Sequence, residues 1–204
     1  NVAECKIKKF GSLTAYMTKR FDRQNTVQRI QQEDFCQGLG LSNKKYQRTE
    51  GGPSIKQCFQ FIHNNLANKA KDELHFLKSI AFNFLIGNSD AHGKNFSYLH
   101  TANGYVLSPL YDLVSTQVYP QLAKEMSMSI GGEYEPDRIT RTNFMVMAKE
   151  LGVKSQLIND ILDKLAAEII VQAEKLKEMM MTEKTYNPVY DKVIEVIKAR
   201  VAQL

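Results

Sequence analysis

A dense group of polar residues interrupts an otherwise apolar stretch in the segment Leu85-Ile86-Gly87-Asn88-Ser89-Asp90-Ala91-His92-Gly93-Lys94-Asn95-Phe96-Ser97. Asp, His, Lys and Asn side chains follow one another closely there. Burying so many polar groups costs stability unless each of them finds a partner, so core packing does not explain the arrangement. The segment is therefore a candidate functional loop.

The residues on either side of this loop have regular patterns. An apolar stripe before it predicts a helix that Asp72 caps and that runs to about Ile86. Residues 95–99 and 104–107 are typical of two strands, and the sequence between them, Thr101-Ala102-Asn103-Gly104, is typical of a hairpin turn. The loop is thus expected to join a core helix to a hairpin.

Apolar periodicity and capping signals predict further elements along the chain. Residues 5–21 are expected to form a hairpin, and residues 22–50 loops with one short helix that begins at Glu33-Asp34-Phe35 and ends at Gly38 or Gly40. The remaining helices are expected at 55–70 with Ser54 as N-cap, at 141–151, at 155–181 and at 187–204, with a polar loop at 131–138. The pattern predicts an α+β fold that is mostly α, in a chain of 204 residues that is long enough for a sizeable core.

The spacing of three polar residues suggests a phosphotransfer site. In protein kinases an Asp orients the substrate hydroxyl, an Asn five positions later holds Mg²⁺, and a second Asp beyond a short hairpin holds the Mg²⁺ that bridges the phosphates. Asp90 and Asn95 have that interval, and the hairpin at 96–107 can return the chain so that Asp112 meets Asn95. His92 and Lys94 lie on the same loop and could neutralise the transferring phosphoryl group.

Other interpretations of the loop stay open. Asp and Asn five residues apart are common by chance, and a polar loop can simply cap the neighbouring helix and turn. A two-metal phosphoesterase is a weaker alternative, because it needs further His ligands and no His follows His100. His63 and His75 fall in predicted helices and are expected to be structural.

The composition excludes several classes of protein. The formal net charge is +5, and residues 1–50 hold the whole excess, which fits either a surface facing phosphates or an ordinary solvated face. No strip of interleaved basic and aromatic residues appears, so nucleic-acid binding by this chain is not expected. No apolar run approaches the ~20 residues of a membrane span. Three widely spaced cysteines without a CxxC pair argue against a disulfide framework and for a reducing, cytoplasmic location.

Six short pieces occur in an order that is typical of one family. They are Arg20-Phe21-Asp22-Arg23, Gln32-Glu33-Asp34-Phe35-Cys36-Gln37, Lys45-Tyr46, Gly51-Gly52-Pro53, Asp90-Ala91-His92-Gly93-Lys94-Asn95-Phe96-Ser97 and Pro109-Leu110-Tyr111-Asp112. On these residues the chain resembles the C-terminal part of the HipA toxin kinases, bacterial serine/threonine kinases of toxin–antitoxin systems. Residues 113–204 fit the family only as a helical region.

The resemblance implies a two-lobed, protein-kinase-like fold and a role for each matched residue. Asp90 is implied as the catalytic base, and Asn95 and Asp112 as the Mg²⁺ ligands. His92, Gly93 and Lys94 are implied in contacts with the phosphates of ATP. The segment Lys19-Arg20-Phe21 resembles the hinge, whose backbone groups meet the adenine; the family commonly has a Glu where Lys19 stands.

One departure from the family matters for activity. The Gly-rich phosphate loop, the ATP lysine and its acidic partner precede the hinge in the family, and no position here matches them. We therefore expect residues 1–21 to be the last N-lobe strands and the hinge, and residues 22–204 to be the helical C-lobe. The chain does not begin with Met, so we expect it to be cut or incomplete at that end. We also expect the chain to be nearly inactive alone, because phosphoryl transfer depends on both lobes.

Two hypotheses follow from the resemblance. The first is a serine/threonine kinase that uses ATP and Mg²⁺, with an aminoacyl-tRNA synthetase as the implied protein substrate. The second is a catalytically silent lobe that acts by binding, for example to an antitoxin partner of the HipB type. The intact set of Asp90, Asn95 and Asp112 favours the first.

Overall fold

The computed structural model describes residues 1–24, 28–42 and 51–204 of the chain. The expected family piece Lys45-Tyr46 lies outside the described residues. Within these ranges no helix combines the length and the apolar character that crossing a membrane would require.

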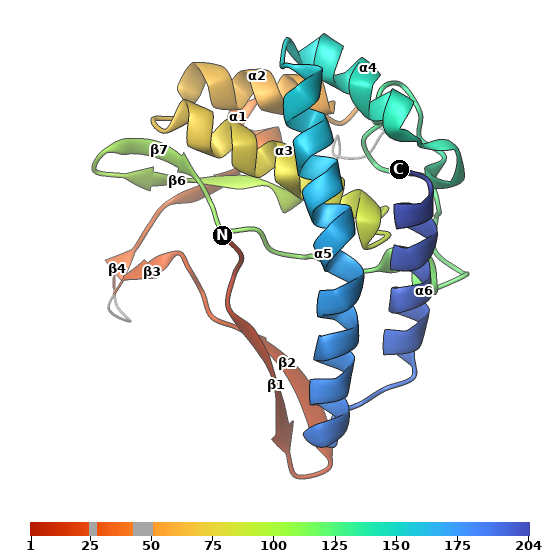
Figure 1. Ribbon diagram of the computed structural model, residues 1–204. Helices are drawn as coiled ribbons and strands as arrows, with labels where there is room; N and C mark the ends of the chain where they lie inside the picture. The colour runs from red at the N-terminus through yellow and green to blue at the C-terminus, as the bar shows by residue number, and fades with distance from the viewer. Residues whose placement is uncertain (25–27, 43–50) are drawn as a thin grey trace.

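The described part is a mixed α/β structure, about half helical, with three small sheets (Figure 1). This confirms the predicted α+β class with mostly helical content. The elements are β1 (Cys5–Phe10), β2 (Leu13–Thr18), β3 (Arg23–Gln24), β4 (Gln28–Arg29), β5 (Gln32–Asp34), α1 (Phe35–Gly38), α2 (Ile55–Asn65), α3 (Lys69–Leu85), β6 (Ser97–Thr101), β7 (Gly104–Leu107), α4 (Arg141–Leu151), α5 (Ser155–Thr182) and α6 (Val189–Ala202). Short 3₁₀ turns lie at Gly93–Asn95, Thr116–Val118 and Pro136–Arg138.

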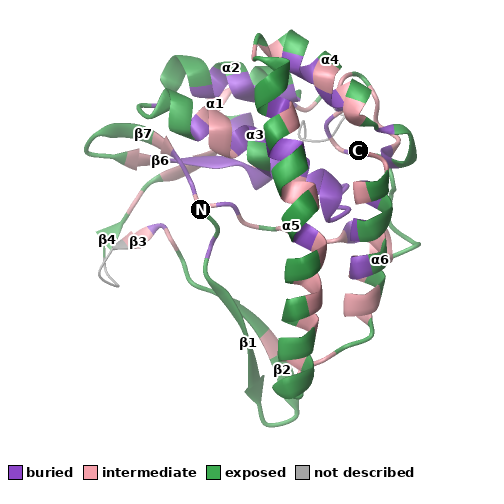
Figure 2. Cartoon of the chain, viewed as in Figure 1, coloured by how far each residue is buried: buried purple, intermediate pink, exposed green. Residues whose placement is uncertain are grey.

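Helix α3 is the centre of the hydrophobic core. Phe76, Ile80 and Phe84 on this helix are buried, and the core continues through residues of α2, α4 and α5 (Figure 2). The ring of Phe84 meets that of Phe144 edge-on at a centroid distance of 5.5 Å. Because α3 ends directly before the polar loop, the packing of this helix fixes where the loop begins.

Two sequence predictions need correction. Residues 22–50 contain more than loops and a short helix, since β5 pairs with β6 and Glu33 lies opposite Tyr98. Asp72 is not the N-cap of α3; that position is Asn68, and Asp72 is buried in the first turn, where its carboxylate accepts a hydrogen bond from the Leu107 N–H at 3.2 Å. Burial raises the pKa of Asp72.

The helix predicted at 55–70 is also too long, because α2 ends at Asn65 and residues 69–70 already belong to α3. The other predicted helix ends are close to the observed ones. Ser54 caps α2 with a reciprocal pair of hydrogen bonds to Gln57, as its sequence position predicts. Gly152 ends α4 with φ of 70°, a left-handed conformation that glycine adopts without strain. The predicted polar loop at 131–138 holds one short 3₁₀ turn.

The N-terminal hairpin stands apart from the helical core in Figure 1. Strands β1 and β2 pair from Cys5 opposite Thr18 to Phe10 opposite Leu13, and most of their side chains are exposed. The hairpin is anchored where Ala3 donates its N–H to the Leu110 carbonyl at 2.8 Å. This contact brings the N-terminal strands beside the segment that leads to Asp112.

Candidate active site

The polar loop after α3 is held in place by the segment 112–127. Gly87 has φ of 70°, which turns the chain out of the helix. Ser89 is fully engaged: its N–H donates to Thr116 Oγ1 at 2.8 Å, its carbonyl accepts from Ser127 at 2.9 Å, and its hydroxyl donates to the Lys124 carbonyl at 2.7 Å. The residue directly before Asp90 is therefore fixed through three polar groups.

Asn95 and Asp112 meet side chain to side chain. The Asn95 amide Nδ2 donates to Asp112 Oδ2 at 2.6 Å, although the residues are 17 positions apart. The strands β6 and β7 lie between them and return the chain to the loop, as the hairpin prediction required. Asp112 has φ of 56°, an uncommon backbone conformation for a residue with a side chain.

Asn88 supports Asp112 from the other side. Its buried Nδ2 donates to the Asp112 carbonyl at 3.1 Å and to Asn83 Oδ1 at 2.8 Å. Its Oδ1 accepts from the Asp90 N–H at 3.2 Å. One side chain thus connects the backbones of both aspartates, which keeps their relative positions constant.

The residues present fit a magnesium ion. The buried Oδ1 of Asn95 has no hydrogen-bond partner among the described residues. An unsatisfied buried amide oxygen is costly unless a cation or water meets it, and it lies next to a carboxylate. Mg²⁺ prefers such oxygen ligands, and it takes its remaining ligands from water and phosphate.

The part of the chain that the structure describes contains no cluster of three or more His, Cys, Asp or Glu side chains suited to a metal. A magnesium site with one Asp and one Asn does not need such a cluster. The two-metal phosphoesterase does need one, so the described residues give that alternative no support.

Asp90 and His92 occupy the rim of this cluster. The Asp90 side chain is 48% exposed, so its carboxylate is open to an approaching molecule. His92 Nε2 lies 3.8 Å from Asp90 Oδ1, and the Lys94 N–H donates to His92 Nδ1 at 3.3 Å. Burial lowers the pKa of His92, and this favours a neutral ring that offers hydrogen bonds rather than a positive charge.

Gly93 and Lys94 have clear structural roles. A Cβ at Gly93 would lie 2.4 Å from Pro53 Cγ and 2.9 Å from Cys36 Sγ, so only glycine fits between them. The Lys94 carbonyl accepts from the hydroxyl of the half-buried Tyr111 at 2.6 Å. Burial raises the pKa of Tyr111 to about 12, so this phenol stays protonated and keeps donating.

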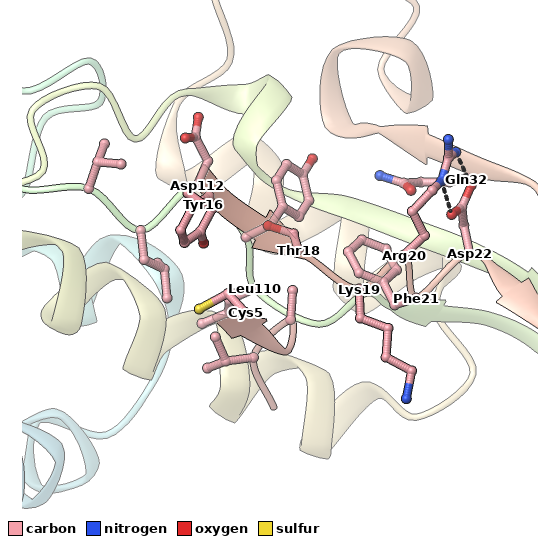
Figure 3. A pocket seen from close by; sticks show the side chains of 15 residues that line it. Cys5, Tyr16, Thr18, Lys19, Arg20, Phe21, Asp22, Gln32, Leu110 and Asp112 are labelled. Atoms are coloured by element: carbon pink, nitrogen blue, oxygen red, sulfur yellow. Dashed lines mark hydrogen bonds and ion pairs between the residues drawn. The ribbon is translucent and has the colours of Figure 1, made fainter. Parts of the chain in front are cut away.

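The three residues of the predicted hinge, Lys19, Arg20 and Phe21, line a cavity together with Asp112. This cavity has a volume of about 660 Å³, and Cys5, Tyr16 and Leu110 also line it (Figure 3). In Figure 3 the pair of Arg20 and Asp22 lies at one end of the labelled side chains and Asp112 at the other. The structure therefore brings the predicted hinge and the predicted metal ligand to one cavity.

Two residues of the predicted hinge have identified hydrogen-bond partners. The Lys19 N–H already donates to the Glu4 carbonyl at 2.8 Å, and its ammonium lies 3.3 Å from the exposed Glu4 carboxylate. Arg20 donates to both oxygens of Asp22 at 2.8 and 2.6 Å. These hydrogen bonds lower the pKa of Asp22 to about 2.

Known proteins are similar to this chain over most of its length. The family model described as HipA-like C-terminal domain matches residues 1–173. This chain belongs to the HipA-like C-terminal domain family. It is 36% identical over 185 residues to the protein Y4mE of Sinorhizobium fredii, which covers 87% of this chain and 44% of that protein. It is 34% identical over 200 residues to the serine/threonine-protein kinase toxin HipA of Shewanella oneidensis, which covers 87% of this chain and 46% of that toxin.

A solved structure of a HipA chain agrees with this membership, and a second structure shares the fold. The HipA chain in a complex of Shewanella oneidensis HipA, HipB and operator DNA matches all of this chain with a TM-score of 0.86 at 29% identity, over 51% of its own length. The Helicobacter pylori kinase CtkA matches with a TM-score of 0.54 at 12% identity, over 77% of its length, and shows a shared fold. The HipA-like chain spans about half the length of the Sinorhizobium and Shewanella relatives that it matches.

Asn88 and Tyr111 also shape the site, although the sequence alone assigns no role to either of them. Asn88 lies in the polar loop without an assigned role, although a second amide beside Asn95 in a short loop indicates that the loop needs internal partners. Tyr111 was noted only within the family piece Pro109-Leu110-Tyr111-Asp112. Its hydroxyl also contacts Ser97 at the start of β6, which ties the segment before Asp112 to the hairpin.

Proposed function

We propose that this HipA-like chain is the catalytic C-terminal part of a serine/threonine kinase that transfers the γ-phosphoryl group of ATP to a protein hydroxyl. The observation that carries the proposal is the buried Asn95 Oδ1, which has no partner among the described residues, beside the carboxylate of Asp112, a residue that lines the 660 Å³ cavity. A lobe that acts only by binding gains nothing from an unsatisfied buried oxygen, which costs stability.

Each residue has a role in this proposal. Asn95 and Asp112 would hold Mg²⁺, which when bound neutralises charge on the nucleotide phosphates. Asp90, half exposed at the rim, orients the substrate hydroxyl and accepts its proton. The cavity lined by Arg20, Phe21 and Leu110 receives the adenine. Neutral His92 and the Lys94 ammonium lie beside the transferring group.

The partners and the compartment are also part of the proposal. A cytoplasmic toxin–antitoxin system is the proposed setting, and the Shewanella relative, which was solved with HipB and operator DNA, supports it. An antitoxin of that type is the proposed partner, and an aminoacyl-tRNA synthetase is the proposed substrate. DNA contact would then belong to the antitoxin rather than to this chain.

Residues 1–21 and 22–204 correspond in this proposal to the end of an N-lobe with its hinge and to the C-lobe. Exposed apolar side chains on the hairpin, such as Phe10, Leu13 and Tyr16, support an upstream partner segment. Phosphoryl transfer depends on positioning between both lobes, so the 204-residue chain alone would transfer little or no phosphate.

Intact mass after incubation with Mg²⁺–ATP tests the proposal. The samples are the full-length protein, its Asp90→Asn variant and the 204-residue chain. A gain of one phosphate, about 80 Da, only in the unmutated full-length protein is the expected result. If neither that protein nor an added protein substrate gains phosphate, the silent binding lobe is the better account.

A further inference from the structure

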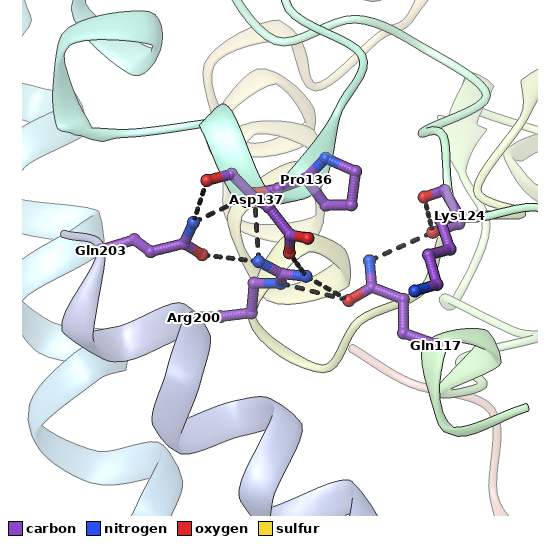
Figure 4. Close-up of polar contacts among 7 residues, drawn as sticks. Gln117, Lys124, Pro136, Asp137, Arg200 and Gln203 are labelled. Carbon is purple, nitrogen blue, oxygen red and sulfur yellow. Dashed lines mark hydrogen bonds and ion pairs between the residues drawn. The ribbon is translucent and has the colours of Figure 1, made fainter. Parts of the chain in front are cut away.

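Helix α6 carries a buried arginine that the proposed chemistry does not use. Arg200 is 8% exposed, and α6 lies beyond the residues 1–173 that the family model matches. A buried guanidinium is costly unless its donors are satisfied, and the contacts of Arg200 are many (Figure 4). The hydrogen bonds of Arg200 therefore show which segments helix α6 contacts.

The guanidinium of Arg200 is satisfied from two directions. On one side Nη1 donates to the Pro136 carbonyl at 3.1 Å and to Gln203 Oε1 at 2.7 Å, and Nη2 donates to Asp137 Oδ1 at 2.7 Å. On the other side Nε and Nη2 both donate to Gln117 Oε1, at 3.1 and 2.8 Å. The Gln117 side chain can then present only its amide nitrogen to its next neighbour.

That neighbour is on the loop of the proposed active site. Gln117 Nε2 donates to Ser89 Oγ at 3.1 Å, and the Gln117 N–H donates to the Gly87 carbonyl at 3.1 Å. The Ser89 hydroxyl, which accepts from Gln117, donates onward to the Lys124 carbonyl. A chain of hydrogen bonds therefore runs from Arg200 through Gln117 to the residue directly before Asp90.

Helix α6 also meets this loop by direct packing. A Cβ at Gly87 would lie 2.5 Å from Val196 Cγ1 and 3.1 Å from Gln117 Oε1. The loop thus turns at a glycine against which α6 packs closely. The guanidinium of Arg200 lies over the Phe84 ring at 5.8 Å, so it also contacts the helix that leads into the loop.

From these contacts we infer that Arg200 and Gln117 are positioning residues for the kinase reaction, and that helix α6 holds Asp90 in its working position through Ser89. The inference rests on the proposed function. It makes the C-terminal helix a functional element rather than only a covering layer. It also gives the two polar atoms of the Gln117 side chain different roles. Oε1 binds Arg200 of α6, and Nε2 binds Ser89 of the loop.

A single substitution separates those two parts. Gln117→Glu keeps an oxygen for Arg200 but removes the N–H that donates to Ser89 Oγ. Misplacement of a catalytic group by about 1 Å can cost about 10²-fold in rate, so we expect kcat to fall about ten- to hundred-fold. KM for ATP should change less than about twofold, because no residue of the chain Arg200–Gln117–Ser89 lines the nucleotide cavity.

The control removes packing from α6 without touching the hydrogen bonds. Ile194 is buried on the same helix, and Ile194→Ala should lower the melting temperature and leave kcat unchanged at temperatures where the protein is folded. Gln117→Glu should show the opposite pattern. If Gln117→Glu retains full kcat, or if Ile194→Ala loses as much, the positioning role is overturned.

A double-mutant cycle tests the route through Ser89. If Gln117 acts through that hydroxyl, Gln117→Glu should cost almost nothing further in a Ser89→Ala background. Additive losses in the two variants would contradict the route.

Hydrogen exchange at the amides of residues 89–91 gives a readout that does not need turnover. Faster exchange there in Gln117→Glu supports the positioning role, and unchanged exchange overturns it. An unmutated full-length protein that transfers no phosphate would instead overturn the proposed function, and the exchange result would still decide what Gln117 holds.

Discussion

The side-chain amide of Asn95 donates a 2.6 Å hydrogen bond to the carboxylate of Asp112 and leaves its own buried oxygen without a partner among the described residues. The pair joins the end of the polar loop to the far side of the β6–β7 hairpin. An oriented carboxylate beside an unsatisfied amide oxygen is the arrangement that the proposed magnesium site requires.

Asp112→Asn should remove the negative charge of this pair and keep its hydrogen bond. The new amide oxygen can still accept from Asn95, so the melting temperature should stay nearly constant. Affinity for Mg²⁺–ATP, measured by titration calorimetry on the full-length protein, should fall at least about ten- to hundred-fold. That is the loss typical of removing a residue that only hydrogen-bonds to a metal ligand. Asp163→Asn, at a 64% exposed carboxylate, is the charge-matched control. Equal affinities in Asp112→Asn and the unmutated protein would contradict metal binding here.

Asn95→Asp should make the site depend on the ion for stability. It places two carboxylates side by side, and like charges at that distance repel unless a cation lies between them. We expect a lower melting temperature without metal and a larger increase on adding Mg²⁺ alone than in the unmutated protein. If Mg²⁺ raises the melting temperature of Asn95→Asp no more than that of the unmutated protein, the expectation is wrong.

Gly93→Ala should strain the loop through its neighbour Pro53. The added methyl needs the space of Pro53 Cγ, and such overpacking costs about 1–3 kcal/mol in the free energy of unfolding. Pro53→Ala opens that space, so urea unfolding of the double variant should show less loss than the sum of the two single losses. Strict additivity would mean that the two residues do not meet.

Asp22 should stabilise the folded protein in a pH-dependent way. Its hydrogen bonds to Arg20 lower its pKa from 3.8 to about 2, so the stabilisation is present above pH 3.8 and is lost as pH falls through 2. Arg20 is 63% exposed and solvent screens the pair, so Asp22→Asn should cost on the order of 1 kcal/mol at pH 7. That difference should shrink in unfolding measurements taken toward pH 2, whereas a constant difference from pH 7 to pH 2 would exclude the ion pair as its source.

Local sequence patterns were sufficient for most helices, for the hairpin and for the meeting of Asn95 with Asp112. Apolar spacing and turn residues depend on neighbours in the chain, and the interval from Asp90 to Asp112 is short enough for one hairpin to close. Strand β5 was missed because Gln32–Asp34 is polar and becomes a strand only by pairing with β6, some 65 residues later.

The contact of α6 with the loop could not be predicted for the same reason. No local signal distinguishes Arg200 from the other basic residues of the last helix, because its burial depends on Gln117 and Asp137, more than 60 positions away. Asp72 was misassigned as a helix cap because an acidic residue near a helix start also fits a cap. Its actual partner, the Leu107 N–H, is 35 positions later.

The most direct test of the phosphotransfer site is the turnover of full-length Asp90→Asn with Mg²⁺–ATP and a protein substrate, beside the unmutated protein. Removal of a positioned base costs about 10²–10⁴-fold, so kcat should fall by that factor while KM for ATP and the melting temperature stay nearly unchanged. Full turnover by Asp90→Asn would contradict the assignment of this loop as the catalytic centre.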